Sequence, residues 1–232
     1  MARKPGASRD QRIMGWAREI GTVLLIAVLL SFLIKTFLFR AFFIPSPSMV
    51  STLEVDDRIF VNLLVPQPFD LARGDVVVFR DAKGWLEPEA DQSSPGFSGA
   101  IQEVLSFIGL APDASEQHLV KRIIGLPGDR VVCCTNADRV AINGVELTET
   151  YINPAEQAVA QTFDVVVPAG KIWVMGDNRN HSADSRMHLE IDGGFIDIDD
   201  VTGKAAVIAW PLERMKLLDN FPEVFKNVAD KG

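Results

Sequence analysis

The sequence predicts a mainly β protein in which a single N-terminal transmembrane helix precedes an antiparallel β-rich domain. Nearly every residue from 20 to 39 is apolar, whereas later apolar residues fall in short runs separated by turn residues. These runs recur without helical patterns between them, which favours antiparallel pairing over βαβ units. Apolar residues make up 47% of the 232 residues, so the chain can bury a substantial core.

The apolar segment 20–39 is long enough to cross a bilayer, because twenty helical residues rise about 30 Å. Lys35 is its only charged residue and lies near the far end, where its stem can reach the headgroups beside Arg40. A buried core helix and a removable signal peptide are the alternatives. Residues 46–48 weakly resemble a signal-peptide cleavage site, but the apolar run is too long for a signal peptide. We therefore expect an uncleaved anchor.

The orientation of this anchor follows from the charges that flank it. The residues before it carry five basic side chains against two acidic ones. The positive-inside rule thus predicts a cytoplasmic segment 1–19 and a domain 41–232 on the outer face of the cytoplasmic membrane, although Lys35 and Arg40 weaken the bias. The whole chain has a net charge of −8, so that domain is strongly acidic, which argues against nucleic acid as a partner.

Short runs rich in β-branched and aromatic residues predict the strands of the external domain. Asn143-Gly144, between two of these runs, is a strong signal for a hairpin turn. No internal repeat is present. The expected strands are residues 58–64, 75–80, 119–124, 130–133, 140–142, 145–147, 163–167, 172–175 and 204–210.

Residues 84–118 depart from this pattern and are expected to form a surface insertion. The segment begins with glycine, proline, serine and acidic residues. Within it, Ile101, Val104, Leu105 and Ile108 have the spacing of one helix face. This apolar stripe is expected either to pack on the sheet or to lie on the membrane surface.

The two cysteines, Cys133 and Cys134, are neighbours in the sequence. Adjacent side chains of a strand point to opposite faces, so a disulfide between them would be strained and two thiols are favoured, although an external location permits a bridge. Neither these cysteines nor His118, His181 and His188 show the spacing of a metal site. We expect no metal and no other cofactor.

Four short motifs carry residues suited to catalysis. They are PSPSMVSTL at 45–53, GDVVVF at 74–79, KRIIGLPGD at 121–129 and GDNRNHSADSR at 176–186. In this order they resemble the four sequence boxes of the type I (leader) signal peptidases, and the resemblance spans residues from about 20 to 210. It implies a membrane-anchored serine endopeptidase that releases signal peptides from exported preproteins by cleaving after small-x-small sites such as Ala-x-Ala.

The chemistry of two motif residues agrees with that resemblance. A serine hydroxyl is a weak nucleophile unless a neighbouring base takes its proton, and a lysine can be that base only when it is neutral. Lys121 is flanked by apolar residues in a strand that should be buried, and burial would lower its pKa. The resemblance implies that Ser48 is the nucleophile, that Lys121 is the general base and that Ser182 orients the lysine amine.

The resemblance also implies an oxyanion hole. The backbone N–H of Ser48 and the hydroxyl of Ser46 are its expected donors. Pro47 lies between them and leaves the Ser48 N–H in place. Ser51 stands where the family usually has proline, which is expected to loosen the turn without abolishing activity.

Charged residues of the third and fourth motifs are expected to support the site. We expect Asp177 to pair with Arg122 and Asp184 to pair with Arg186, so that these four side chains form a structural charge network. A catalytic aspartate is the alternative, but the lysine already supplies a base. His181 suggests a serine–histidine pair, but it does not occupy a motif position assigned to catalysis.

An extended substrate peptide is expected to add as a strand between residues 42–46 and the strand that leads to Lys121. By the same resemblance, shallow pockets select small side chains, and the bilayer holds the substrate's own apolar segment nearby. Preproteins delivered by the export machinery and the lipid bilayer are the expected partners of a monomeric enzyme. The expected pocket residues are Ile44, Pro45, Met49, Leu53 and Leu119.

Two other functions fit part of the sequence. Self-cleaving repressors share the serine–lysine chemistry and this β fold, but they are cytoplasmic and bind DNA, which an anchor and an acidic domain disfavour. A membrane-tethered binding module built on a degenerate peptidase would lack Ser48 or Lys121, and both are present.

Overall fold

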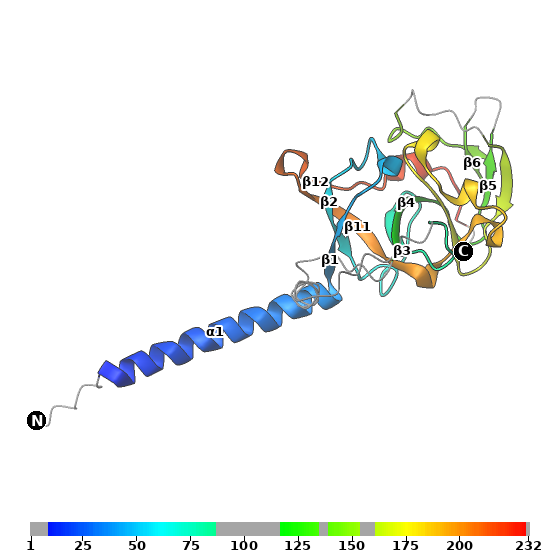
Figure 1. The fold of residues 1–232 in the computed structure, drawn as a ribbon. Helices are drawn as coiled ribbons and strands as arrows, with labels where there is room; N and C mark the ends of the chain where they lie inside the picture. Colours follow the sequence, from blue (N-terminus) through cyan, green and yellow to red (C-terminus); the bar gives the residue numbers. More distant parts are fainter. Residues whose placement is uncertain (1–8, 87–116, 135–138, 154–160, 231–232) are drawn as a thin grey trace, which may run out of the picture. The chain divides into compact units, whose positions relative to one another are not determined.

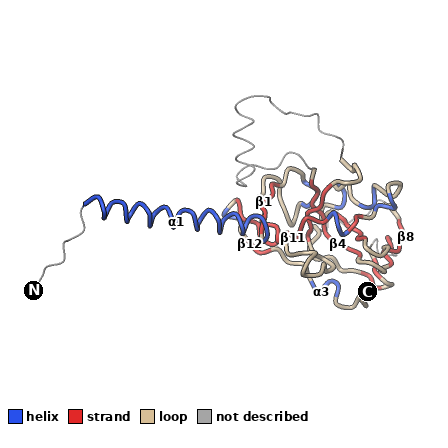
Figure 2. Tube along the Cα trace, turned by 90° about the horizontal axis from the view of Figure 1, so that it is seen from below, coloured by secondary structure: helices blue, strands red, loops and turns tan. Residues whose placement is uncertain are grey.

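The computed structural model describes residues 9–86, 117–134, 139–153 and 161–230. The chain divides into two compact units, Met1–Leu38 and Phe39–Gly232. The first unit contains one long helix, and the second is built from strands with short helical turns between them (Figure 1, Figure 2). The mainly β, antiparallel fold predicted from the sequence is confirmed.

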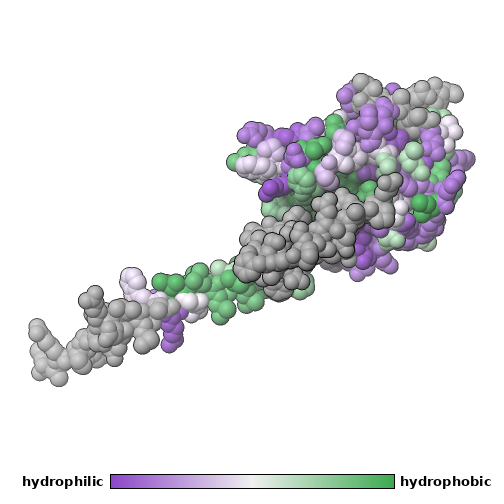
Figure 3. Space-filling model, viewed as in Figure 1, coloured by the Kyte–Doolittle hydropathy of each residue, from purple (hydrophilic) through white to green (hydrophobic). Residues whose placement is uncertain are grey.

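Helix α1, Arg9–Phe37, forms the first unit. Its large apolar side chains, such as Leu24, Leu25 and Leu29, are exposed, and they give the helix the hydrophobic surface seen in Figure 3. Across the residues that the structure describes, the helices do not combine the length and the apolar character that crossing a bilayer requires.

The larger sheet has the strand order β1-β2-β11-β3-β4-β9-β10, with β12 also paired to β11. All of these pairs are antiparallel. β11 lies between β2 and β3, so it joins the pair β1–β2 to the pair β3–β4. The strands are β1 Phe39–Phe43, β2 Arg58–Asn62, β3 Val76–Arg80, β4 His118–Gly125, β9 Lys171–Met175, β10 Ile196–Asp197, β11 Val201–Trp210 and β12 Lys216–Leu217.

The smaller sheet has the order β7-β6-β5-β8 and is also antiparallel. Asn143 and Gly144 join β6 to β7 with φ values of 53° and 84°, the left-handed pair that a tight hairpin turn requires, so the predicted turn is confirmed. The strands are β5 Arg130–Cys133, β6 Ala141–Ile142, β7 Val145–Glu146 and β8 Phe163–Val166.

Short helical segments connect the strands. The 3-10 helix η1 joins β1 to β2, and η3 and η4 follow β9. Their bounds are η1 Pro47–Met49, η3 Arg179–His181, η4 Ser185–Met187, η5 Asp192–Gly194, η6 Ile198–Asp200, η7 Leu212–Arg214 and α3 Pro222–Phe225.

Both faces of the larger sheet are covered at β3. Val76 and Val78 pack in one apolar cluster, whereas Val77 and Phe79 pack in another, and all four are buried. A strand covered on both faces needs an unbroken apolar run, which is what the second motif supplies. A third apolar cluster, which includes Trp173, contains buried residues of the smaller sheet.

The expected strands are present, with bounds that differ by up to three residues. The structure adds three strands that were not predicted, β1, β10 and β12. β1 begins at Phe39, where the apolar segment 20–39 ends, so the sequence shows no separate alternating pattern for this strand. β10 and β12 have only two residues each, too few for a periodic pattern.

The expectation of two cysteine thiols is wrong, because Cys133 and Cys134 form a disulfide. β5 ends at Cys133, and Cys134 follows outside the strand. The alternation of side chains that disfavours a bridge within a strand therefore does not constrain Cys134.

Most of the expected insertion, residues 87–116 with the stripe from Ile101 to Ile108, lies outside the described residues. Trp85, just before that segment, is buried. Its ring stacks on His188 at 4.2 Å between ring centroids and meets Phe79 edge-on. These contacts attach Trp85, close to the last described residue before position 87, to the rest of the domain.

Candidate active site

Ser48 lies in η1, the single 3-10 turn between β1 and β2. Pro47 opens the turn, a position where its fixed φ and missing N–H are tolerated, and the Val50 N–H donates to the Pro47 carbonyl at 3.0 Å. Met49 and Leu53 anchor the turn in the apolar cluster beneath β2 and β11. Ser48 itself is 7% exposed.

Lys121 lies in β4, where it pairs with Val77 of β3, and it is 2% exposed. Its Nζ atom is 2.8 Å from the Ser48 Oγ atom and also donates to the Val120 carbonyl at 3.0 Å. The fold therefore brings together two residues that are 73 positions apart in the sequence.

The environment of Lys121 favours its neutral form. Burial lowers the pKa of Lys121 from 10.5 to about 8, and the carboxylates of Asp184 and Asp177 oppose part of that shift. Close to pH 8 the buried amine is thus neutral in about half of the molecules. A neutral amine at hydrogen-bond distance can take the proton of the Ser48 hydroxyl.

The two other serines of the predicted site differ in their contacts. Ser46 Oγ lies 3.2 Å from Ser48 Oγ, so the structure brings Ser46 to the predicted nucleophile. Ser182 is buried close to Gly176, where a Cβ atom on that glycine would lie 2.2 Å from Ser182 Oγ. Within the described residues, this hydroxyl makes no hydrogen bond of standard geometry, although its interaction with Asp184 helps to lower the pKa of that carboxyl.

Arg122 and Asp177 form a fully buried ion pair. Arg122 Nε donates to Asp177 Oδ1 at 2.8 Å, and a second guanidinium nitrogen donates to Oδ2 at 2.7 Å. Thr52, in the turn after the nucleophile, donates its hydroxyl to Asp177 and accepts from Arg122 at 3.2 Å. The pair therefore fixes the nucleophile segment to β4 and β9.

Asp184 and Arg186 form the second expected pair, with Nε–Oδ1 and Nη2–Oδ2 distances of 2.8 and 2.7 Å. Burial raises the pKa of Asp184, but its hydrogen bonds with Arg186 and the charge of that guanidinium outweigh burial, so the pKa lies below its ordinary value. The carboxylate stays ionised and accepts the Gly176 N–H at 2.9 Å. This contact holds the start of the fourth motif.

One further ion pair at the site was not predicted. Arg179 makes two hydrogen bonds to the Glu149 carboxylate, at 2.7 and 2.6 Å, and both side chains are buried. Tyr151 donates its hydroxyl to the same carboxylate, and its ring lies 4.2 Å from the Arg122 guanidinium. Glu149 lies outside the four motifs, and no sequence signal indicated its partner.

The predicted pocket residues are only partly together. Ile44, Met49 and Leu53 belong to one apolar cluster, and Pro45 is exposed beside them. Leu119 packs instead in the cluster of Val77 and Phe79, on the other face of β3.

The histidines lie apart from the nucleophile's hydrogen bonds. His181 Nδ1 is 3.2 Å from Asn178 Oδ1, and His188 Nδ1 is 2.8 Å from the Asp184 carbonyl. Across the described part of the chain, no three His, Cys, Asp or Glu side chains are grouped as metal ligands would be.

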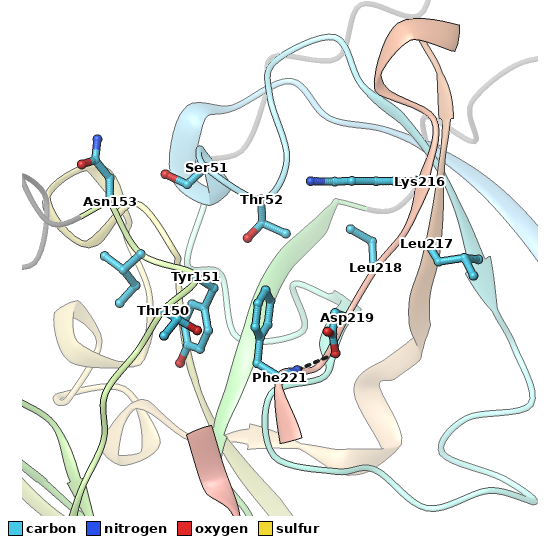
Figure 4. Close-up of a pocket in the computed structure, with 11 residues that line it drawn as sticks. Ser51, Thr52, Thr150, Tyr151, Asn153, Lys216, Leu217, Leu218, Asp219 and Phe221 are labelled. Carbon is cyan, nitrogen blue, oxygen red and sulfur yellow. Dashed lines mark hydrogen bonds between the residues drawn. The ribbon is translucent and has the colours of Figure 1, made fainter. Parts of the chain in front are cut away.

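A cavity of about 460 Å³ lies behind the nucleophile turn and includes neither Ser48 nor Lys121. Figure 4 shows Ser51 and Thr52 on one side of it, Tyr151 on another, and Phe221 at its base. Thr52 thus separates this cavity from the buried Arg122–Asp177 pair. The predicted nucleophile and base, Ser48 and Lys121, lie outside this cavity at hydrogen-bond distance from each other, and they remain the candidate site.

The sequence profile of the family described as "Signal peptidase, peptidase S26" matches residues 17–210. The chain belongs to this family. It is 38% identical over 223 residues to signal peptidase I of Mycobacterium tuberculosis, covering 85% of this chain and 74% of that protein. It is 31% identical over 216 residues to signal peptidase I P of Bacillus subtilis subsp. natto, covering 90% and 95%.

A solved signal peptidase I from Enterococcus faecalis matches 58% of this chain and 95% of that chain, with 26% identity and a TM-score of 0.37. The sequence matches alone carry the family assignment. Membership means that this chain is a type I signal peptidase and a serine endopeptidase.

Proposed function

We propose that this signal peptidase releases signal peptides by attack of Ser48 on the scissile carbonyl carbon, with Lys121 as the general base. The observation that carries the proposal is the 2.8 Å distance between Lys121 Nζ and Ser48 Oγ, with the lysine buried and its pKa lowered to about 8. Neutral Lys121 takes the hydroxyl proton as Ser48 Oγ bonds to the carbonyl carbon.

The remaining steps use the same groups. The Ser48 N–H and the Ser46 hydroxyl stabilise the oxyanion of the tetrahedral intermediate, and protonated Lys121 gives its proton to the leaving amine. The mature protein then departs, and an ester joins Ser48 to the signal peptide. Lys121, neutral again, takes a proton from water, and the resulting hydroxide attacks the ester carbonyl carbon. As the ester bond breaks, Lys121 returns the proton to Ser48 Oγ, and the signal peptide leaves with a free carboxylate.

The substrates are preproteins that carry signal peptides, cut after small-x-small sites such as Ala-x-Ala. Residues 42–46 and the start of β4 offer extended edges for the substrate backbone. Ile44, Pro45, Met49 and Leu53 lie around the nucleophile turn, where they suit shallow pockets for small side chains. Leu119 packs on the other face of β3, so it is not part of this proposed pocket.

The charged groups are proposed to hold the site in place. The pairs Arg122–Asp177 and Asp184–Arg186 tie the nucleophile segment and the fourth motif to the sheet. Ser182, buried next to Gly176, is proposed to orient the Lys121 amine during the reaction.

We also propose a location on the outer face of the cytoplasmic membrane, with a single span at 20–39 and a cytoplasmic N-terminus. The apolar run of the sequence and the basic residues before it support this, as do the exposed apolar side chains of α1. The catalytic domain is proposed to act as a monomer at the bilayer surface.

The activity is tested by incubating the purified full chain, in detergent, with a preprotein that carries an Ala-x-Ala site, followed by sequencing of the new N-terminus. We expect a single cut after the second alanine. A new N-terminus elsewhere, or an intact preprotein, would contradict the proposed function.

The mechanism is tested with variants of the two reacting residues. Ser48→Ala and Lys121→Ala should each abolish cleavage, and the double variant should be no worse than either single one, because the two groups act as one unit. Lys121→Arg should also be inactive, since a guanidinium does not give up its proton. Turnover near the wild-type rate in any of these variants would exclude the serine–lysine assignment.

A further inference from the structure

We propose that Asn178 is a positioning residue that holds the nucleophile turn in its reactive conformation; this inference rests on the proposed function. Asn178 directly follows Asp177 in the fourth motif and is 8% exposed. Its side chain is polar and buried, yet neither the proton transfers nor the oxyanion hole described above uses it.

Asn178 binds two consecutive carbonyl groups of the turn. Its backbone N–H donates to the Ser48 carbonyl at 3.1 Å, and its side-chain nitrogen donates to the Pro47 carbonyl at 3.0 Å. Two adjacent peptide planes are therefore fixed by one residue that lies 131 positions away from Pro47. The Cα–Cβ bond of Ser48 projects from the backbone between these planes, so its direction toward Lys121 is fixed with them.

Four contacts hold the segment that carries Asn178. Asp184 accepts the Gly176 N–H, and Arg179 donates to the Gly176 carbonyl at 3.1 Å. The Arg179 carbonyl accepts from Arg186 at 2.9 Å, and the Arg179 guanidinium is bound to buried Glu149. The unpredicted Glu149–Arg179 pair thus anchors the residue that follows Asn178.

The asparagine side chain is also oriented for donation. His181 Nδ1 lies 3.2 Å from Asn178 Oδ1, which leaves the amide nitrogen directed at the Pro47 carbonyl. A carboxylate of the same shape has no hydrogen to donate, so it would place two oxygens against each other. Among the described residues, Asn178 makes no hydrogen bond to Ser48 Oγ or to Lys121 Nζ, and it acts through the backbone of the turn.

Two variants of Asn178 and one control test the proposal in the full chain with the preprotein assay. Asn178→Ala removes the side-chain donor but keeps the backbone N–H, and Asn178→Asp keeps the shape while removing the donor. The matched control is Asn180→Ala, two residues away on η3, where the asparagine is exposed.

We expect both Asn178 variants to lower kcat by about 100-fold with KM unchanged, because a small misplacement of a reacting group has an effect of that size. Thermal unfolding should stay close to wild type. In Asn178→Ala the pH at which the rate rises should not move, because Lys121 stays buried. In Asn178→Asp the added carboxylate favours the protonated amine, as Asp177 and Asp184 do, so any shift should be to higher pH. Asn180→Ala should keep the wild-type kcat.

Two results would overturn the positioning role. One is an unchanged kcat in both Asn178 variants. The other is a lower kcat in Asn178→Ala accompanied by lower thermal stability and a rate that rises at higher pH, which would show that Asn178 keeps water from Lys121 instead of aiming Ser48. If the wild-type chain fails to cut the preprotein at all, the proposed function fails, and that outcome is separate from both.

Discussion

Lys121 combines a catalytic requirement with a cost in stability at a single side chain. The folded state lowers its pKa from 10.5 to about 8, so between these values the unfolded chain binds more protons than the folded protein. Stability attributable to this residue therefore rises with pH across that window. Below pH 8 the folded protein carries a buried cation, and the full penalty is present.

The first prediction concerns the rate of cleavage as a function of pH. The rate should rise with a slope of about one log unit per pH unit and level off above pH 8, because only neutral Lys121 accepts the Ser48 proton. At pH 6 the rate should be about 100-fold below the plateau. Steady-state kcat/KM between pH 6 and 10 checks this, and a rise centred near 6.5 would indicate a histidine base instead.

The second prediction concerns stability. Lys121→Met should be inactive and more stable than wild type at pH 7, by about 3 kcal/mol, because it removes the penalty of a charged buried amine. The gain should shrink as pH rises from 8 and vanish near 10.5. Denaturant unfolding of both proteins at pH 7 and pH 10 measures it, and an equal or lower stability of the variant at pH 7 would refute the linkage.

At the scale of elements, the long regular strands could be predicted and the short ones could not. β3 and β5 were found within one residue of their bounds, because continuous or alternating apolar runs define them. β10 and β12 depend on pairing with β9 and β11, which a local pattern does not encode. Cys134 was misjudged for a related reason, since the end of β5 at Cys133 is set by tertiary structure.

The residues of the candidate site also divide into those that the sequence predicts and those that only the folded chain brings together. Ser48, Lys121 and the pairs Arg122–Asp177 and Asp184–Arg186 all lie in the four motifs. The resemblance to the family therefore predicts them as one site. Glu149 does not lie in a motif, and only the folded chain places its carboxylate against Arg179. The two hydrogen bonds of Asn178 to the nucleophile turn could not be read from sequence either, because both reach across elements far apart in the chain.

The third prediction compares a buried ion pair with an exposed one. Asp177→Ala leaves the Arg122 guanidinium buried without its carboxylate, and we expect a loss of about 3–5 kcal/mol in the free energy of unfolding. Asp164→Ala breaks the exposed pair with Arg130 and should have little effect. Chemical denaturation of the two variants checks this, and equal losses would show that burial does not decide the effect.

At the scale of the whole molecule, the fourth prediction concerns orientation in the membrane. Protease added to intact spheroplasts that express the protein should digest residues after Arg40 and spare a short N-terminal fragment, because the basic residues before the apolar run favour the cytoplasm. Immunoblotting with tags at both ends measures this. Full protection of the C-terminal tag before lysis would show that the domain lies on the other side.

The position of β11 governs when activity can arise during biosynthesis. Ser48 lies between β1 and β2, whereas Lys121 lies on β4, and among the described strands β11 is the one that joins these two groups. A nascent chain that has reached only residue 200 lacks this strand, so the pairing that joins the two groups of strands has not yet formed. We therefore expect Ser48 to meet its proposed base, Lys121, only once almost the entire polypeptide has been made, which would delay proteolytic competence until translation is nearly finished.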